Sequence, residues 1–159
     1  MPKVVPPVLL SAEHEVAAFD CNAPSLNAWL QKKALINQTA GTSRCFVLCE
    51  GKKVIGYYSL SLGAIGHASA SKCLAVVLLN RFAIDEKYHN TGLGSALLRD
   101  ALIRVVSAAR AIEVFAIVLP TLSESAKRFY LSRGFVQSPL DPMMLMMTVE
   151  TARLILTVS

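Results

Sequence analysis

The stretch Leu78–Arg99, LLNRFAIDEKYHNTGLGSALLR, decides how the rest of the chain is interpreted. The apolar run that begins at Val76 has the length of a strand and extends into this stretch, where Asp85 ends it. A polar turn and a glycine-bearing loop follow, and the pattern predicts a helix that begins around Gly92. A strand that leads through a glycine loop into a helix N-terminus is suited to binding an anion. The first helical N–H groups lack internal partners there, and the helix dipole is positive.

The glycines of this loop would let a phosphate group approach the backbone, but their spacing matches neither of two common phosphate-binding motifs. No Gly-Lys-Ser/Thr follows, which excludes a P-loop, and the glycine spacing differs from the G-x-G-x-x-G of dinucleotide-binding folds. Asn90 tolerates a left-handed conformation nearly as well as glycine does, so it suits a tight loop of this kind. The alternative interpretation is a strand-to-helix turn that binds no ligand.

The loop resembles motif A of the GNAT superfamily of N-acetyltransferases, whose pattern is Gln/Arg-x-x-Gly-x-Gly/Ala. The match here is His89-x-x-Gly92-x-Gly94, with histidine in place of the usual first residue. The LNRFAID strand before the loop and the FYLSRGF stretch at 129–135 strengthen the resemblance, which covers about residues 19 to 148.

Length and composition limit the class of protein. A chain of 159 residues has the size of one domain, and we expect a single domain over residues 1–159. No run of 18 apolar residues exists, so no membrane span is expected. The start MPKVVPPVLL lacks the layout of a signal peptide, which favours the cytoplasm. The net charge of +5 suits an anionic ligand or nucleic acid, although solubility alone also explains it.

The cysteines and methionines predict no metal site. The four cysteines show neither CxxC spacing nor nearby histidines, and Cys45 and Cys49 lie on one face of an apparent strand, as small buried thiols would. The methionines near residues 143–147 indicate flexible core packing.

Around the central stretch, the pattern predicts an α/β fold with a central mixed β-sheet flanked by helices on both faces, which is the GNAT architecture. Tyr57 and Tyr58 alternate across a strand, so one is expected to be buried while the other lines a surface. Trp29 is expected to anchor the core; the alternative is a stacking platform. The expected elements are a weak strand at 8–10; a helix from the capping residue Asn22 that buries Leu35 and Ile36; strands at 44–49 and 54–62; a loop or frayed helix at 63–74; a helix at 92–109; a strand at 113–119; a helix opened by a capping box from Thr121 to Glu124; and strands from Phe135 and at 143–149.

The GNAT resemblance implies that acetyl-CoA is the co-substrate. In that family the strand before motif A pairs with the pantetheine arm, and the loop amides hold the pyrophosphate. Pantetheine contacts are therefore expected at Phe82, Ala83 and Ile84, and pyrophosphate contacts at His89, Asn90, Thr91, Gly92, Leu93 and Gly94. Arg81 is expected to reach the 3′-phosphate or the acceptor; the alternative is a plain charge at a strand end.

The resemblance also implies a general acid at Tyr130, which would protonate the departing thiolate. The alternative is a core tyrosine whose hydroxyl bonds a neighbouring carbonyl. His67 has no partner in view, and no base stands out. An α-amino acceptor with a pKa of about 8 is already partly neutral, so water could take its proton.

Five stretches resemble the GNAT toxins of bacterial type II toxin–antitoxin modules: FDC at 19–21, LNAWL at 26–30, GYYSL at 56–60, LNRFAID at 79–85 and AKRFY at 126–130. Such toxins acetylate the α-amine of aminoacyl-tRNA and block translation. A ribbon-helix-helix antitoxin neutralises them and binds operator DNA, so DNA is expected only through the antitoxin. A homodimer is also expected. The connection at 63–75 is shorter than in those toxins.

The expected tRNA contacts are basic residues outside the coenzyme site: Lys32, Lys33, Arg44, Lys52, Lys53 and Arg81. A solvated basic edge is the alternative. Two other functions stay open, namely acetylation of a small amine or protein N-terminus, and a non-catalytic module that binds acyl-CoA.

Overall fold

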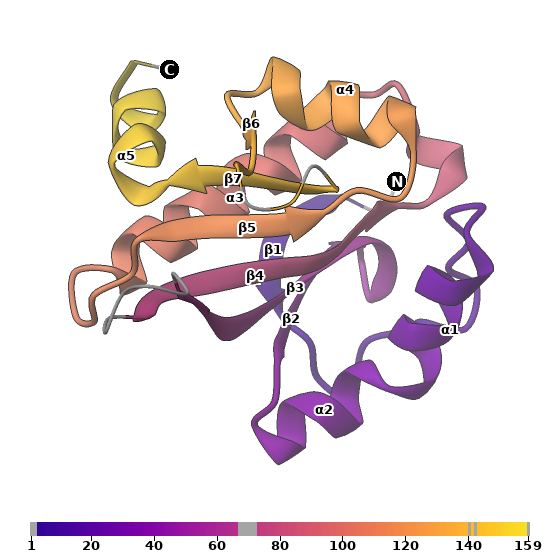
Figure 1. Ribbon diagram of the computed structural model, residues 1–159. Coiled ribbons are helices and arrows are strands. Elements are labelled where there is room, and N and C mark those ends of the chain that lie inside the picture. Colours follow the sequence, from indigo (N-terminus) through magenta and orange to yellow (C-terminus); the bar gives the residue numbers. More distant parts are fainter. Residues whose placement is uncertain (1–2, 67–72, 140, 142, 159) are drawn as a thin grey trace. The chain divides into compact units, whose positions relative to one another are not determined.

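The computed structural model describes residues 3–66, 73–139, 141 and 143–158 (Figure 1). The elements are β1 (Val4–Leu9), α1 (Pro24–Lys32), α2 (Ala34–Ala40), β2 (Arg44–Glu50), β3 (Lys53–Gly66), β4 (Cys73–Ile84), the 3-10 helix η1 (Glu86–Tyr88), α3 (Leu93–Ala108), β5 (Ala116–Pro120), α4 (Glu124–Ser132), β6 (Val136–Gln137), β7 (Met144–Thr148) and α5 (Val149–Val158).

The strands form a seven-stranded mixed sheet in the order β1-β2-β3-β4-β5-β7-β6. β4 and β5 pair in parallel, whereas β1 with β2, β2 with β3, β5 with β7 and β6 with β7 pair antiparallel. This arrangement confirms the predicted fold class. The chain forms two compact units, Met1–Ser61 with Arg81–Ala101 and Leu62–Asn80 with Leu102–Ser159. The single domain over residues 1–159 stays a prediction.

In the first unit, two neighbouring tyrosines show that helices cover both faces of the sheet. Tyr57 lies under α1, where its ring stacks on Trp29 at 5.9 Å and its hydroxyl donates to the Leu26 carbonyl at 2.7 Å. Tyr58 points to the other face, where its hydroxyl donates to the Asp100 carboxylate of α3 at 2.5 Å. Both tyrosines are fully buried, so the expectation that one lines a surface was wrong. Trp29 is buried, as predicted.

The predicted first helix is two helices. α1 ends at Lys32 and α2 starts at Ala34, and the break at Lys33 turns the second helix so that Ala34 is buried while Leu35 and Ile36 are exposed. Asn22 is not the cap, because it has a φ of 68° and Ala23 occupies the N-cap position.

Two strands differ in extent from the prediction. β1 starts earlier than expected and contains Pro6 and Pro7, which an edge strand tolerates; its register shifts between Val5 and Val8. Residues 63–66, expected as loop or frayed helix, continue β3. His67 lies outside the described residues.

In the second unit, the helix after β5 begins later than predicted. Ser123, not Thr121, is the N-cap of α4, and its hydroxyl accepts the Ala126 N–H at 3.1 Å. The Thr121 hydroxyl instead donates to the Met143 carbonyl at 3.3 Å. Gly134, with a φ of 103°, follows the helix as expected. The strand expected to end at Val149 ends at Thr148, and Val149 instead begins α5, which includes residues 151–156 that are too short a stretch to assign from the sequence.

The expected burial holds for two of the cysteines and for Met147, whereas Met143 is exposed. Cys45 and Cys49 are buried in one core cluster, and burial raises the pKa of Cys45 to about 12 and that of Cys49 to about 11. Among the described residues, no group of three His, Cys, Asp or Glu side chains is arranged to hold a metal ion. In the same part of the chain, every helix is too short or too polar to cross a bilayer.

Candidate active site

Asp85 fixes the end of β4, the strand expected to pair with pantetheine. Its carboxylate is 2% exposed and accepts the backbone N–H groups of Asp20 and Lys87, each at 3.1 Å. Its own N–H donates to the Ile55 carbonyl at 2.8 Å. These bonds hold the strand end that carries Phe82, Ala83 and Ile84. The sequence pattern identified Asp85 only as the end of an apolar run and missed its role as the N-cap of η1. The signal that could have revealed this role is an acidic residue directly before a short turn.

His89 closes the loop onto the same strand. Its Nε2 lies 2.7 Å from the Ile84 carbonyl oxygen and donates to it, since a carbonyl can only accept. The Thr91 hydroxyl donates to the Tyr88 carbonyl. His89 therefore has a structural contact that holds the loop backbone in place.

The loop takes the left-handed backbone that its sequence predicts. Asn90 has a φ of 62° and Gly92 a φ of 84°, and α3 begins at the next residue, Leu93. The positive end of this sixteen-residue helix therefore lies at the loop. A Cβ placed on Gly92 would meet nothing within 4 Å, so the space beside the glycine is open. A left-handed loop with open space at a helix N-terminus fits a pyrophosphate.

In the second unit, Tyr130 is buried on α4, with 7% of its surface exposed. Its ring makes edge-on contacts with Phe129 at 5.3 Å and Phe135 at 5.6 Å between centroids. Burial raises the pKa of Tyr130 above its ordinary value. The phenol therefore stays protonated throughout the physiological range, which is the state that a proton donor needs.

Arg81 is held against the core of the first unit. Its guanidinium carbon lies 4.2 Å from the centroid of the Trp29 ring, on which Tyr57 also stacks. A guanidinium over an indole face is an attractive cation–π arrangement. The Trp29 ring therefore fixes the Arg81 side chain, and Arg81 lies on β4 directly before the residues assigned to pantetheine.

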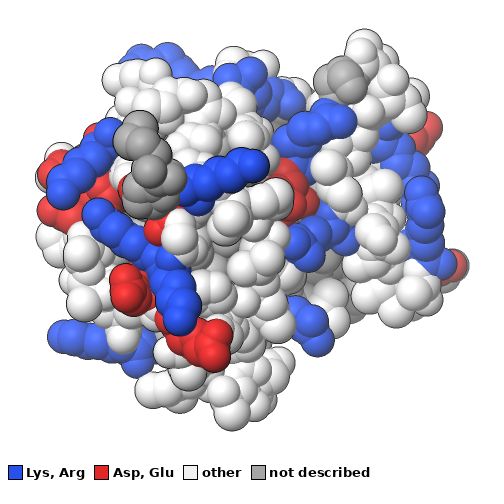
Figure 2. Space-filling view, turned by 180° about the vertical axis from the view of Figure 1, so that it is seen from behind, with Lys and Arg blue, Asp and Glu red and all other residues white. Residues whose placement is uncertain are grey.

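The structure does not bring the other five predicted tRNA contacts into one patch. Lys32, Lys33, Arg44 and Lys52 are exposed and Lys53 is half-buried. Arg44 starts β2 and Lys53 pairs with Glu50 at its other end, which separates them by about 20 Å along six residues of strand. Figure 2 shows Lys and Arg side chains spread over the visible face with acidic groups between them.

Comparison with known proteins agrees with the motif. Residues 41–137 match the family described as acetyltransferase (GNAT) domain. A Mycobacterium tuberculosis protein named tRNA-acetylating toxin is 41% identical over 155 residues, which cover 92% of this chain and 93% of that protein.

Two solved structures resemble the fold. One contains a tyrosine-to-phenylalanine mutant of the toxin AtaT, bound to the C-terminus of the antitoxin AtaR and to acetyl-CoA; its TM-score is 0.88 at 27% identity, covering 95% of this chain and 97% of the other. The other is AtaTR bound with acetyl-CoA, with a TM-score of 0.91 at 25% identity, covering 98% and 99%. The family match across residues 41–137 and the identity over nearly the whole length show that the chain belongs to the GNAT family of acetyltransferases.

Proposed function

We propose that the chain is an acetyl-CoA-dependent N-acetyltransferase toxin that acetylates the α-amino group of aminoacyl-tRNA and thereby blocks translation. The observation that carries this proposal is the 41% identity to a protein named tRNA-acetylating toxin, over 92% of the chain. The β4–α3 loop supports the proposal, because its left-handed backbone and the open space beside Gly92 lie at a helix N-terminus, which suits a pyrophosphate.

The coenzyme would be held mainly by backbone groups. Phe82, Ala83 and Ile84 are assigned to the pantetheine arm, and the loop from His89 to Gly94 to the pyrophosphate. The binding of acetyl-CoA by AtaT and AtaTR supports this assignment. We assign no metal, since the reaction needs none.

Acetyl-CoA supplies the activated acetyl group as a thioester. The lone pair of the acceptor amine forms the new bond to the acetyl carbon, the carbon–sulfur bond breaks, and sulfur leaves with the electron pair. We assign Tyr130 the role of donating its phenolic proton to that sulfur. The amine loses its proton to water, which suffices because an α-amine has a pKa of about 8.

The proposed partners follow from the relatives. AtaT binds the antitoxin AtaR, which supports an antitoxin as partner of this chain; we propose a ribbon-helix-helix antitoxin that alone contacts operator DNA. A homodimer and a cytoplasmic location, where charged tRNA occurs, complete the proposal.

The test is acetyl transfer to total charged tRNA. The protein is incubated with acetyl-CoA and charged tRNA, released coenzyme thiol is measured, and the amino acids recovered from the tRNA are analysed by mass spectrometry. We expect thiol release and an added acetyl group on one or a few amino acids, with none on deacylated tRNA. Release with small amines or protein N-termini but not with charged tRNA would favour the acetyltransferase alternative. Coenzyme binding without release on any acceptor would favour the non-catalytic module.

A further inference from the structure

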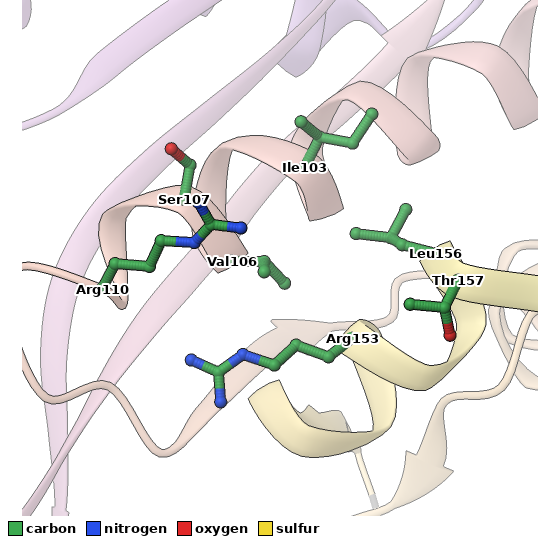
Figure 3. A pocket seen from close by; sticks show the side chains of 7 residues that line it. All are labelled: Ile103, Val106, Ser107, Arg110, Arg153, Leu156 and Thr157. Atoms are coloured by element: carbon green, nitrogen blue, oxygen red, sulfur yellow. The ribbon is translucent and has the colours of Figure 1, made fainter.

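A groove of about 440 Å³ lies between the C-terminal end of α3 and α5, within the second unit (Figure 3). The α3 side contributes positions 103, 106, 107 and 110, and α5 contributes positions 153, 156 and 157. Spacings of three and four residues place each set on one face of a helix. Apolar grooves between helices are one of the recurring sites at which an amphipathic helix binds.

The groove combines an apolar floor with two cations. Ile103, Val106 and Leu156 form the apolar part, and Ile103 keeps 46% of its surface exposed. Arg110 follows the C-terminus of α3 and Arg153 lies in the middle of α5. Figure 3 shows the two arginines on one side of the groove and Ile103 and Leu156 on the other.

Neither guanidinium has an acidic partner within the described part of the chain. No Asp or Glu lines the groove, and among the described residues neither arginine side chain forms a hydrogen bond or an ion pair. A guanidinium binds carboxylates through two parallel hydrogen bonds. The groove thus offers two unused carboxylate-binding groups beside an apolar surface.

Charge selects among the possible occupants. A second copy docked symmetrically would bring the arginines of both copies into one interface, where the groove lining supplies no Asp or Glu to pair with them. A nucleic acid backbone would pair with the arginines but leave the apolar floor uncovered. We propose that the groove docks an acidic amphipathic segment of a partner protein, with apolar side chains on the floor and carboxylates on Arg110 and Arg153. This proposal is independent of the acceptor that the enzyme acetylates.

The test uses two synthetic amphipathic helical peptides with the same apolar face, one flanked by glutamates and the other by lysines. Binding is measured by fluorescence anisotropy and located by amide NMR shifts on the full chain. We expect the glutamate peptide to bind at least about tenfold more tightly, with shifts at the groove residues. Arg110→Glu with Arg153→Glu should remove that preference, whereas the control Arg128→Glu, an exposed arginine of α4 outside the groove, should retain it. Ile103→Ser tests the apolar contribution without a charge change and should weaken binding several-fold.

Three results would overturn the proposal. The peptides could bind equally or shift residues elsewhere. A polyuridine strand could bind the groove and lose affinity in the double arginine variant, which would identify a nucleic acid surface. Finally, sedimentation could show a dimer that the double variant dissociates, which would identify a contact between copies. Thermal unfolding of each variant confirms that it remains folded.

Discussion

Asp85 and His89 act on the same short piece of backbone from two sides. The buried Asp85 carboxylate fixes the start of η1, and the His89 ring holds the Ile84 carbonyl at 2.7 Å. Each of these side chains forms a hydrogen bond with a backbone group, so the two contacts restrain the backbone from Ile84 to His89. The loop is therefore ordered before any ligand arrives, which lowers the entropy lost on binding.

Replacing His89 tests how much the ordered loop contributes to acetyl-CoA affinity. His89→Ala removes one hydrogen bond to Ile84, and a bond of this kind is worth about 0.5–1.5 kcal/mol, so acetyl-CoA affinity should fall roughly two- to tenfold in calorimetry. His89→Gln keeps an N–H donor and introduces a residue that is usual at this position of the motif. This variant should recover affinity. Equal affinity for the alanine variant and the unmodified protein would mean that the bond does not preorganise the loop.

Tyr130→Phe tests the assigned general acid. The variant keeps the edge-on contacts with Phe129 and Phe135 and loses only the phenolic proton. The rate of acetyl transfer should fall by about 10²–10⁴-fold, the usual contribution of such a group, while acetyl-CoA affinity and the melting temperature change little. Turnover close to that of the unmodified protein would return Tyr130 to the role of a core residue.

The pH profile gives an independent test of the same residue. Burial disfavours the phenolate and raises the pKa of Tyr130, so the acid keeps its proton beyond the ordinary phenol value of about 10. With a hydrolysis-resistant aminoacyl-tRNA analogue, the rate should rise as the α-amine loses its proton at a pH of about 8. It should then stay level to a pH of about 10. A fall in rate centred below about pH 9 would show that the acid is another group.

At the scale of elements, the β4–α3 segment could be predicted because each local signal agreed with the fold. The apolar strand, the left-handed tolerance of Asn90 and the glycine before the helix all pointed to one arrangement. The break at Lys33 could not be predicted, since neither glycine nor proline marks it. The choice of Ser123 over Thr121 as the cap depended on a bond from Thr121 to Met143, which is 22 residues away in the chain. The burial of Tyr58 likewise depended on Asp100 of α3.

Gly92→Val tests whether the β4–α3 loop holds the coenzyme. Its left-handed φ of 84° should cost valine about 1–2 kcal/mol of stability, and the side chain would enter the open space assigned to the pyrophosphate. Acetyl-CoA affinity should fall at least about tenfold in calorimetry.

Gly41→Val is the matched control for this substitution. Gly41 ends α2 with a φ of 80°, and a Cβ placed on it would also meet nothing within 4 Å, so valine there carries a comparable backbone strain. It should lower the melting temperature without reducing acetyl-CoA affinity. Equal losses of affinity in the two variants would attribute the effect of Gly92→Val to stability alone.

At the scale of the molecule, sequence proximity was a poor guide to the distribution of charge. Arg44, Lys52 and Lys53 lie within ten residues of one another, yet the length of β2 puts Arg44 at one end and the lysines at the other. A count of basic residues could predict an anionic partner. It could not show how far apart the strand would hold these residues, because that distance follows from the register of the hairpin.

The two lysine pairs can therefore be tested separately for tRNA binding. Lys32→Glu with Lys33→Glu, at the exposed end of α1 and the break that follows it, should weaken tRNA binding and spare acetyl-CoA affinity. Each phosphate contact to a single strand contributes roughly −0.7 to the slope of log affinity against log salt, so losing two contacts should flatten that slope by roughly 1.4.

Lys52→Glu with Lys53→Glu is the comparison at the far end of β2 from Arg44. If neither pair changes the affinity or the slope, tRNA binds elsewhere or is not the acceptor. An effect confined to the second pair would place the tRNA backbone at the turn between β2 and β3.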